Sequence, residues 1–208
     1  TGGSAIALGD IADLADAIVY VWYPGQEGGH AVADVLYGNV SPSGKLPVSF
    51  PKALADLPPF EDYNMAGRTY RYAEVEPQYP FGFGLGYSRF TYDRVVASEA
   101  IAPGESLPVQ VTLTNAGPVD SEEVVQVYLS PASLAPGDPL YTLVGFRRVF
   151  VPAGATQTVF FTLGADELAT VDESGAVAVR PGAWRLIAGG SSPGPRSAAL
   201  GAAEMVEM

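Results

Sequence analysis

Residues 19–51 read VYVWYPGQEGGHAVADVLYGNVSPSGKLPVSFP, and this stretch decides the first part of the fold. Ile18–Tyr23 is an apolar, β-branched and aromatic run whose length suits a strand buried on both faces. Between Glu27 and Tyr37 apolar residues recur at helical spacing, and Gly38 stands where a left-handed residue ends a helix. Prolines and glycines at 39–47 then turn the backbone away. The stretch predicts a strand, a helix and an exit loop of an α/β layer.

The residues before this stretch predict another short helix, and the residues after it lack any periodicity. Residues 1–17 contain a glycine-rich loop and a short amphipathic helix, with Asp10 as its N-cap. Residues 52–59 are polar and proline-rich without periodicity, which indicates an ordered linker over the surface. We expect residues 1–58 to form the end of an α/β domain and residues 59–92 to form an interdomain linker.

Aromatic side chains crowd the second half of that linker. The crowded residues are Tyr63, Tyr70, Tyr72, Tyr79, Phe81, Phe83, Tyr87, Phe90 and Tyr92. Such rings bury large apolar areas, so a cluster of them in a loop-rich stretch favours contact between two domains over a ligand platform. The cluster predicts a tight interdomain seam.

From about Arg94 the apolar pattern changes to a period of two. Short strands are predicted at 107–113, 125–129, 143–151, 159–163, 177–179 and 184–188, with Gly and Pro between them. About seven such strands over roughly 100 residues, without helical periodicity, favour an immunoglobulin-like sandwich at 93–190, with Trp184 in its core. The remaining residues, 191–208, predict a tail that is loose or lies along a partner.

Composition excludes several classes of function. The chain carries 23 acidic and 11 basic residues, a net charge of −12, so it lacks the basic footprint of a nucleic-acid-binding protein. It has no basic amphipathic stretch, no apolar run of about 18 residues and no signal-peptide pattern, so we expect no membrane partner. The absence of cysteine excludes disulfides and thiolate metal sites.

Three ordered segments carry a resemblance to a known family. They are WYPGQEGGHAVADVLYGNVSPSGKLPVSFPK (22–52), DYNMAGRTYRY (62–72) and YPFGFGLGYSRFTY (79–92). They resemble the end of the α/β sandwich domain of glycoside hydrolase family 3 and its bridge into a fibronectin type III-like domain. The resemblance implies an α/β fragment followed by an all-β, fibronectin type III-like sandwich.

The resemblance also implies where the catalytic groups lie. Retaining hydrolysis of a β-glycoside needs two carboxyl groups about 5 to 5.5 Å apart. In the resembled family the nucleophile is an aspartate on a barrel domain and the acid/base is a glutamate on the α/β sandwich, and both motifs precede the segment that matches Thr1. We therefore expect no catalytic residue in this chain, and no cofactor, since family hydrolysis needs none.

Two residues invite a catalytic or metal-binding interpretation that the sequence does not support. Glu27 precedes two glycines at a helix N-terminus, where the helix dipole favours a charged carboxylate and disfavours a proton donor. His30 is the only histidine, and no other ligands are spaced near it. We expect Glu27 to be structural and His30 to lie on the surface or in the seam.

The loop with Asp62, Tyr63, Met65 and Arg68 is the candidate substrate-binding site. It combines a carboxylate, an aromatic ring and a guanidinium, groups that hold sugar hydroxyls and stack on sugar faces. The alternative is structural: Arg68 or Arg71 would form an ion pair with an acidic neighbour and lock the linker. Those neighbours are Glu61, Asp62 and Glu74.

A lone strand and helix would leave a sheet edge unpaired and apolar faces in water. The resemblance of TGGSAIAL to a loop within the α/β domain implies that Thr1 is a cut or processed end. We expect as partner a second chain with the catalytic barrel and the rest of the α/β sandwich, and as substrate a β-linked oligosaccharide or aryl glycoside.

Two alternatives remain open. The sandwich could be a noncatalytic module that binds carbohydrate or protein, or the chain could come from a relative with rearranged domain order. The resemblance leaves glucose and xylose open as the sugar and implies a periplasmic or secreted protein, with a cytoplasmic location open.

Overall fold

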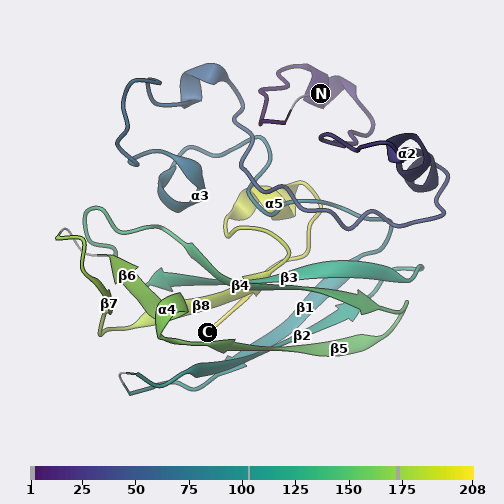
Figure 1. Cartoon of the computed structure of the whole chain (residues 1–208). Helices are drawn as coiled ribbons and strands as arrows, with labels where there is room; N and C mark the ends of the chain where they lie inside the picture. The colour runs from purple at the N-terminus through teal and green to yellow at the C-terminus, as the bar shows by residue number, and fades with distance from the viewer. Residues whose placement is uncertain (1–2, 103, 172–173) are drawn as a thin grey trace.

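The computed structural model describes residues 3–102, 104–171 and 174–208. Figure 1 shows two parts, an irregular N-terminal part with short helices lying over a β-sandwich. The N-terminal part contains the helices α1 (Ile11–Leu14), α2 (Gly28–Leu36) and α3 (Thr69–Tyr72), and the 3-10 helix η1 (Leu54–Asp56). Within the described ranges, no helix combines the length and apolar character needed to cross a bilayer.

The predicted strand at Ile18–Tyr23 does not form. None of the described strands pairs with this run, although its residues are β-branched or aromatic. A strand requires neighbours whose backbone groups complete its ladder, and the described part of the chain supplies none here. Ile18 and Val19 remain 40% and 47% exposed, so the run that was expected to be buried on both faces lies partly in solvent.

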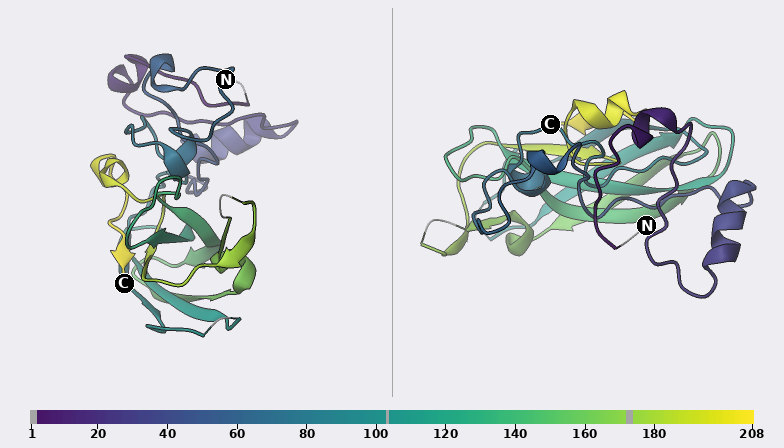
Figure 2. Two further views of the ribbon diagram at one scale, coloured as in Figure 1. Left: turned by 90° about the vertical axis from the view of Figure 1, so that its left-hand side faces the viewer. Right: turned by 90° about the horizontal axis from the view of Figure 1, so that it is seen from above.

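Helix α2 confirms the predicted helix, and Gly38 follows it with φ 76°, the left-handed conformation expected there. Its apolar stripe is only partly covered: Val32 and Val35 are half-buried, while Leu36 is 65% exposed. Figure 2, seen from above, shows α2 projecting from one side of the molecule. Asp10 occupies the predicted N-cap position of α1, but its backbone is already helical and its side chain makes no cap hydrogen bond.

Two antiparallel sheets form the predicted sandwich. One has the strand order β1-β2-β5 and the other β4-β3-β8-β9. The strands are β1 (Phe90–Ala97), β2 (Leu107–Asn115), β3 (Ser121–Pro131), β4 (Thr142–Val151), β5 (Thr156–Leu163), β8 (Trp184–Gly189) and β9 (Val206–Glu207). Alternate residues of β2, β3 and β5 point inward and fill the core, which includes the fully buried Val111, Leu113 and Val127.

Two details of the sandwich differ from expectation. The run 177–179 forms β7 (Val177–Val179), which pairs with β6 (Ala169–Val171) in a separate two-stranded sheet after the short helix α4 (Ala165–Leu168). Trp184 packs against the core from its margin, half-buried, and its indole N–H donates to the carbonyl of Arg180 at 3.3 Å. One predicted strand, 177–179, therefore lies outside the sandwich.

Residues after Gly190 fold onto the sandwich, which corrects the expectation of a loose or partner-bound tail. They form α5 (Pro195–Ala199) and then β9, which extends the sheet beside β8. The hydroxyl of Ser191 donates to that of Ser197 at 2.7 Å, and both side chains are buried. Met205 and Val206 are half-buried and pack the tail against the sandwich. The small, polar residues that dominate the rest of the tail gave no indication of this packing.

The predicted aromatic seam is confirmed. Phe50, only 2% exposed, bridges to Tyr79 and packs against the rings of Tyr20 and Trp22. Tyr70 stacks on Phe81 with centroids 4.3 Å apart, and its ring edge meets Tyr128 of β3. The seam therefore joins the N-terminal part to the sheet beneath it. Tyr63 and Tyr87 do not join it in this way, since they are 87% and 46% exposed.

Candidate functional site

The candidate loop is stabilised by two of its own polar side chains. Oδ1 of Asp62 accepts a hydrogen bond from the backbone N–H of Asn64 at 2.9 Å. Oδ1 of Asn64 accepts one from the backbone N–H of Ala66 at 3.0 Å. These side-chain-to-backbone bonds imitate tight turns, so the loop has a defined shape although it lies on the surface.

Arg68 points into the loop and closes it. Its Nε donates to the carbonyl of Asn64 at 3.1 Å, and one terminal nitrogen donates to the carbonyls of Pro59 and Asp62, at 2.8 Å for Pro59. Three backbone carbonyls therefore occupy much of the guanidinium. We conclude that Arg68 holds the loop in shape and has few donors left for another group.

The alternative interpretation by ion pairs is wrong. Among the residues that the structure describes, no ion pair joins Arg68 or Arg71 to the neighbouring acidic residues. The carbonyl of Arg71 instead accepts a hydrogen bond from the backbone N–H of Leu140 at 2.6 Å, and its guanidinium approaches Oγ1 of Thr142 at 3.5 Å. Arg71 therefore fixes the linker through a backbone contact just before β4 and a side-chain contact with its first residue.

Tyr63 and Met65 lie on the outer side of the same loop. Tyr63 is 87% exposed and Met65 is 47% exposed, and the neighbouring Phe60 is 85% exposed. The structure thus brings Asp62, Tyr63, Met65 and Arg68 together on one loop and divides their tasks. Asp62 and Arg68 shape the loop, and Tyr63 and Met65 present apolar surface.

Helix α3 anchors this loop to the sandwich through a strained residue. Thr69 has φ 56°, an outlier for a β-branched side chain. Its hydroxyl accepts the backbone N–H of Arg71 at 3.2 Å, and the hydroxyl of Tyr70 accepts the backbone N–H of Leu143 at 3.1 Å. The stack of Tyr70 on Phe81, both half-buried, keeps the outlier in place, so the loop leaves the seam in a fixed direction.

Glu27 and His30 form a surface pair. Nδ1 of His30 lies 2.7 Å from Oε2 of Glu27, and the two side chains are 87% and 72% exposed. The predicted surface position of His30 is confirmed. Within the described residues, no three His, Cys, Asp or Glu side chains lie close enough together to hold a metal ion.

A buried ion pair, which the sequence analysis missed, links the two parts. Nζ of Lys45 lies 3.1 Å from Oε1 of Glu123, with the side chains 13% and 8% exposed, and also donates to the carbonyl of Gly84 at 2.9 Å. The hydroxyl of Tyr92 donates to the same carboxylate oxygen at 3.1 Å. Burial raises the pKa of Glu123, and Lys45 opposes that rise. The exit loop of the first part is thus bound to the core of the sandwich.

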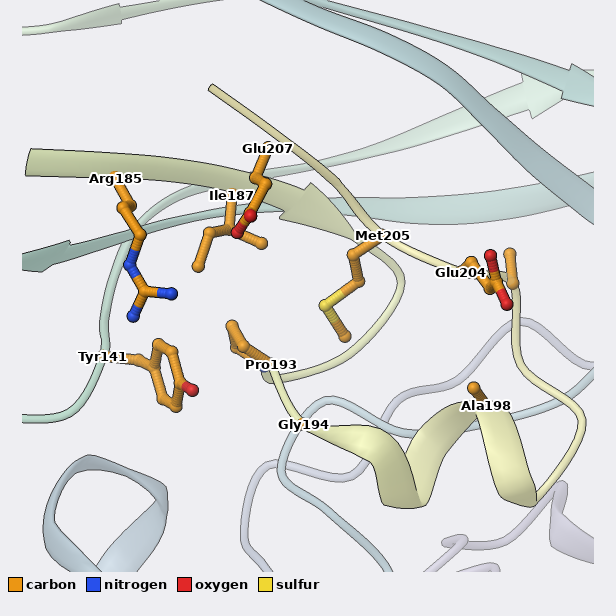
Figure 3. Close-up of a pocket in the computed structure, with 10 residues that line it drawn as sticks. Tyr141, Arg185, Ile187, Pro193, Gly194, Ala198, Glu204, Met205 and Glu207 are labelled. Carbon is orange, nitrogen blue, oxygen red and sulfur yellow. The ribbon is translucent and has the colours of Figure 1, made fainter. Parts of the chain in front are cut away.

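A pocket in the sandwich was also missed. Figure 3 shows Tyr141, Arg185 and Glu207 around it, contributed by the approach to β4, by β8 and by β9. These residues are far apart in the sequence and carry no common motif. Only the sheet order, with β9 beside β8, brings them together.

Comparison with known proteins assigns both parts of the chain. Residues 1–87 match the family description "Glycosyl hydrolase family 3 C-terminal domain", and residues 123–192 match "Fibronectin type III-like domain". The chain therefore belongs to glycoside hydrolase family 3 and contains the end of the α/β sandwich domain followed by the fibronectin type III-like domain.

Individual relatives agree with this assignment. The chain is 43% identical to a xylan 1,4-beta-xylosidase of Xylanibacter ruminicola over 91% of its own length and 22% of the relative. It is 32% identical to a periplasmic beta-glucosidase of Salmonella typhimurium, over 90% of its own length and 26% of the relative. It spans about a quarter of the relatives that it matches.

Solved structures show the same arrangement. A beta-D-glucoside glucohydrolase from Trichoderma reesei superposes with a TM-score of 0.81 at 30% identity, over 90% of this chain and 30% of that one. A beta-glucosidase from Erythrobacter marinus gives a TM-score of 0.82 at 32% identity, over 100% of this chain and 26% of that one. The fold class expected from the sequence is confirmed.

Proposed function

We propose that this chain is the C-terminal part of a retaining, exo-acting β-glycosidase that removes terminal β-D-glucosyl or β-D-xylosyl residues from nonreducing ends. The catalytic carboxylates come from the segment that carries the barrel and the rest of the α/β sandwich, so the chain alone is inactive. The observation that carries this proposal is that both parts match β-xylosidases and β-glucosidases over about a quarter of the relatives' length.

The exposed apolar surface of the N-terminal part supports a missing partner. Large apolar side chains along residues 6–40 lie in solvent, although the sandwich below is well packed. The most exposed are Ile11, Leu14, Tyr23, Leu36, Tyr37 and Val40. So many exposed apolar side chains in one part of a chain favour an interface. We assign it to the remaining strands and helices of the α/β sandwich, on the same or a second polypeptide.

The candidate loop has a role in this proposal. Tyr63 supplies a ring for the face of a sugar, Met65 supplies adjoining apolar surface, and Asp62 supplies a carboxylate for a sugar hydroxyl. Arg68 keeps the loop in shape through its three carbonyl contacts. The loop would thus position substrate near carboxylates that another segment contributes.

A chimaeric enzyme tests the proposal. Residues 1–208 replace the matching C-terminal region of the Xylanibacter ruminicola β-xylosidase, and hydrolysis of nitrophenyl β-xyloside and β-glucoside is measured. We expect the chimaera to be active, and both the relative without its C-terminal region and the chain alone to be inactive. The ratio of the two rates reports the sugar preference that this part imposes.

Two results would contradict the proposal. The first is hydrolysis of either substrate by the chain alone at the rate of the chimaera, which would mean that its own residues carry the chemistry. The second is a soluble, folded chimaera without activity.

We further propose a periplasmic or secreted location, by analogy with the periplasmic Salmonella relative. Fractionation of the native host with an antibody to the chain tests this location.

A further inference from the structure

The pocket beside β8 and β9 combines an apolar floor with polar walls. Its volume is about 340 Å³, and its lining contains the largely buried Ile187 together with Pro193 and Met205. In Figure 3 the guanidinium of Arg185, the ring of Tyr141 and the carboxylate of Glu207 project toward the same space. The lining is completed by Gly194, Ala198, Ala203 and Glu204.

The polar wall is held in position by the sandwich. A terminal nitrogen of Arg185 donates to the hydroxyl of Ser130 at 3.1 Å, and Ser130 is fully buried on β3. Glu207 is held by the pairing of β9 with β8, where it lies opposite Ile187. The donor fork and the carboxylate therefore belong to paired strands of one sheet, which gives them a defined separation.

The chemistry of the lining selects a neutral ligand with both hydroxyl groups and an apolar face. Arg185 can only donate hydrogen bonds and Glu207 can only accept them, a combination that suits vicinal hydroxyls. Arg185 offsets part of the negative charge of Glu204 and Glu207, which weakens the attraction of the lining for a cation. Glu204, Glu207 and the net charge of −12 disfavour an anion. Tyr141 and Ile187 offer surface to C–H groups.

We propose that this pocket binds a neutral pyranose ring of a saccharide. Its volume is at the lower end of the range for small-molecule sites, which suits one sugar unit. Arg185 and Glu207 would hold adjacent hydroxyls, and Tyr141 would pack on the ring. The site lies beside α3, because Leu140, next to Tyr141, donates its backbone N–H to the carbonyl of Arg71.

The test is an NMR titration of the full chain, residues 1–208, with xylobiose and cellobiose. We expect saturable shifts of the backbone amides of Tyr141, Arg185, Ile187 and Glu207. The variant Tyr141→Ala should weaken binding about tenfold or more, as expected for loss of a central aromatic contact. The matched control Tyr37→Ala removes a tyrosine that is 84% exposed on the N-terminal part and should leave the affinity unchanged.

Further variants keep the test decisive if Tyr141→Ala is unstable. Arg185→Met and Glu207→Gln change the polar wall with little change in shape, and each should weaken saccharide binding. Shifts confined to other surfaces would overturn the proposal, as would titration by inorganic phosphate at these amides without response to either sugar. The titration measures saccharide binding by this pocket, whereas the chimaera measures hydrolysis. Failure of the pocket proposal is therefore distinguishable from failure of the proposed function.

Discussion

Lys45 and Glu123 carry opposite charges in a place from which water is nearly excluded. Their contacts with each other and with neighbouring groups offset the cost of removing these charges from water. The ammonium reaches both the carboxylate and the carbonyl of Gly84, and the carboxylate also accepts the hydroxyl of Tyr92. Removing one partner of such a pair leaves a buried, uncompensated charge, which is more costly than exchanging both.

We predict that Lys45→Met lowers the free energy of unfolding by about 3 to 5 kcal/mol near neutral pH. Burial already raises the pKa of Glu123 above its ordinary value of 4.5, and loss of Lys45 raises it further. The difference in stability between the native chain and the variant should therefore be absent below that ordinary value and grow as the pH rises above it. The difference should level off above the pKa that Glu123 has in the folded variant. Urea unfolding of both proteins across this pH range measures it.

The matched control is Lys52→Met. Lys52 pairs with Glu76 at 2.7 Å, but the two side chains are 48% and 45% exposed, so we expect little loss of stability. Equal losses for the two variants, or a loss for Lys45→Met that does not depend on pH, would contradict the assignment of a buried charge pair.

Tyr63 allows a second prediction at this scale. In the active chimaera, Tyr63→Ala should lower kcat/KM for aryl glycosides about tenfold or more, because it removes the exposed ring proposed to face the sugar. Phe160→Ala, which removes an aromatic 57% exposed on β5, is the control and should change kcat/KM little. Unchanged kinetics in the Tyr63 variant would remove this residue from the proposed substrate contacts.

Some residue positions could be predicted from sequence and others could not. The left-handed Gly38 follows from local chain geometry alone. Glu123 lies on the inward-facing parity of β3 with Val125 and Val127, but the predicted strand began only at residue 125, so its burial was not predicted. Its partner Lys45 is 78 positions away by sequence number and only tertiary packing reveals it. Arg68 was expected to meet carboxylates and instead binds carbonyls, because turn geometry decides which acceptors it can reach.

At the scale of elements, local pattern predicted those strands whose neighbours lie in the same sandwich. The alternation over 107–113 and 125–129 became β2 and β3. The run Ile18–Tyr23 has equally strong β propensity but pairs with none of the strands that the structure describes, and β9 is too short to show a period. Strand formation depends on a partner as well as on residue type, so sequence pattern alone misjudged both.

The exposed run at 18–23 predicts self-association of the chain. Its exposed apolar side chains, among them Val19 and Tyr23, offer a surface to a second copy. We expect oligomers in light scattering at raised protein concentration, and we expect Val19→Lys to reduce them by placing a charge in the segment. Val119→Lys changes a residue of similar exposure, 40% against 47%, in the loop before β3. Equal effects of the two lysines would argue against this segment.

At the scale of the whole molecule, backbone contacts join the exit loop to the linker, and join the linker to the tail that folds onto the sandwich. Leu46 exchanges hydrogen bonds with Phe83 and Gly82, and the backbone N–H of Ser192 donates to the carbonyl of Phe81. A Cβ at Gly84 would lie 2.2 Å from the carbonyl oxygen of Gly44, so these two segments of the chain approach as closely as glycine permits. We expect the two parts to unfold in one transition.

The close approach gives a prediction for the seam. Gly84→Ala should lower the free energy of unfolding by about 1 to 3 kcal/mol, because backbone must shift to admit the methyl group. Gly44→Ala is the control on the opposite side of the contact, since a Cβ there meets nothing within 4 Å. Thermal unfolding of both variants measures this. Two separate transitions in the native chain, or equal stability of the variants, would show that the seam does not couple the parts.

The binding of the exit loop to the sandwich also limits how this region can be inherited. Residues 43–50 belong by sequence to the α/β part, yet Lys45, Leu46 and Phe50 are joined to Glu123, Phe83 and Tyr79. A genetic crossover between residues 50 and 79 would combine halves from different ancestors and mismatch these contacts. A crossover upstream of the exit loop would transfer them intact, so the loop and the sandwich form one unit of exchange.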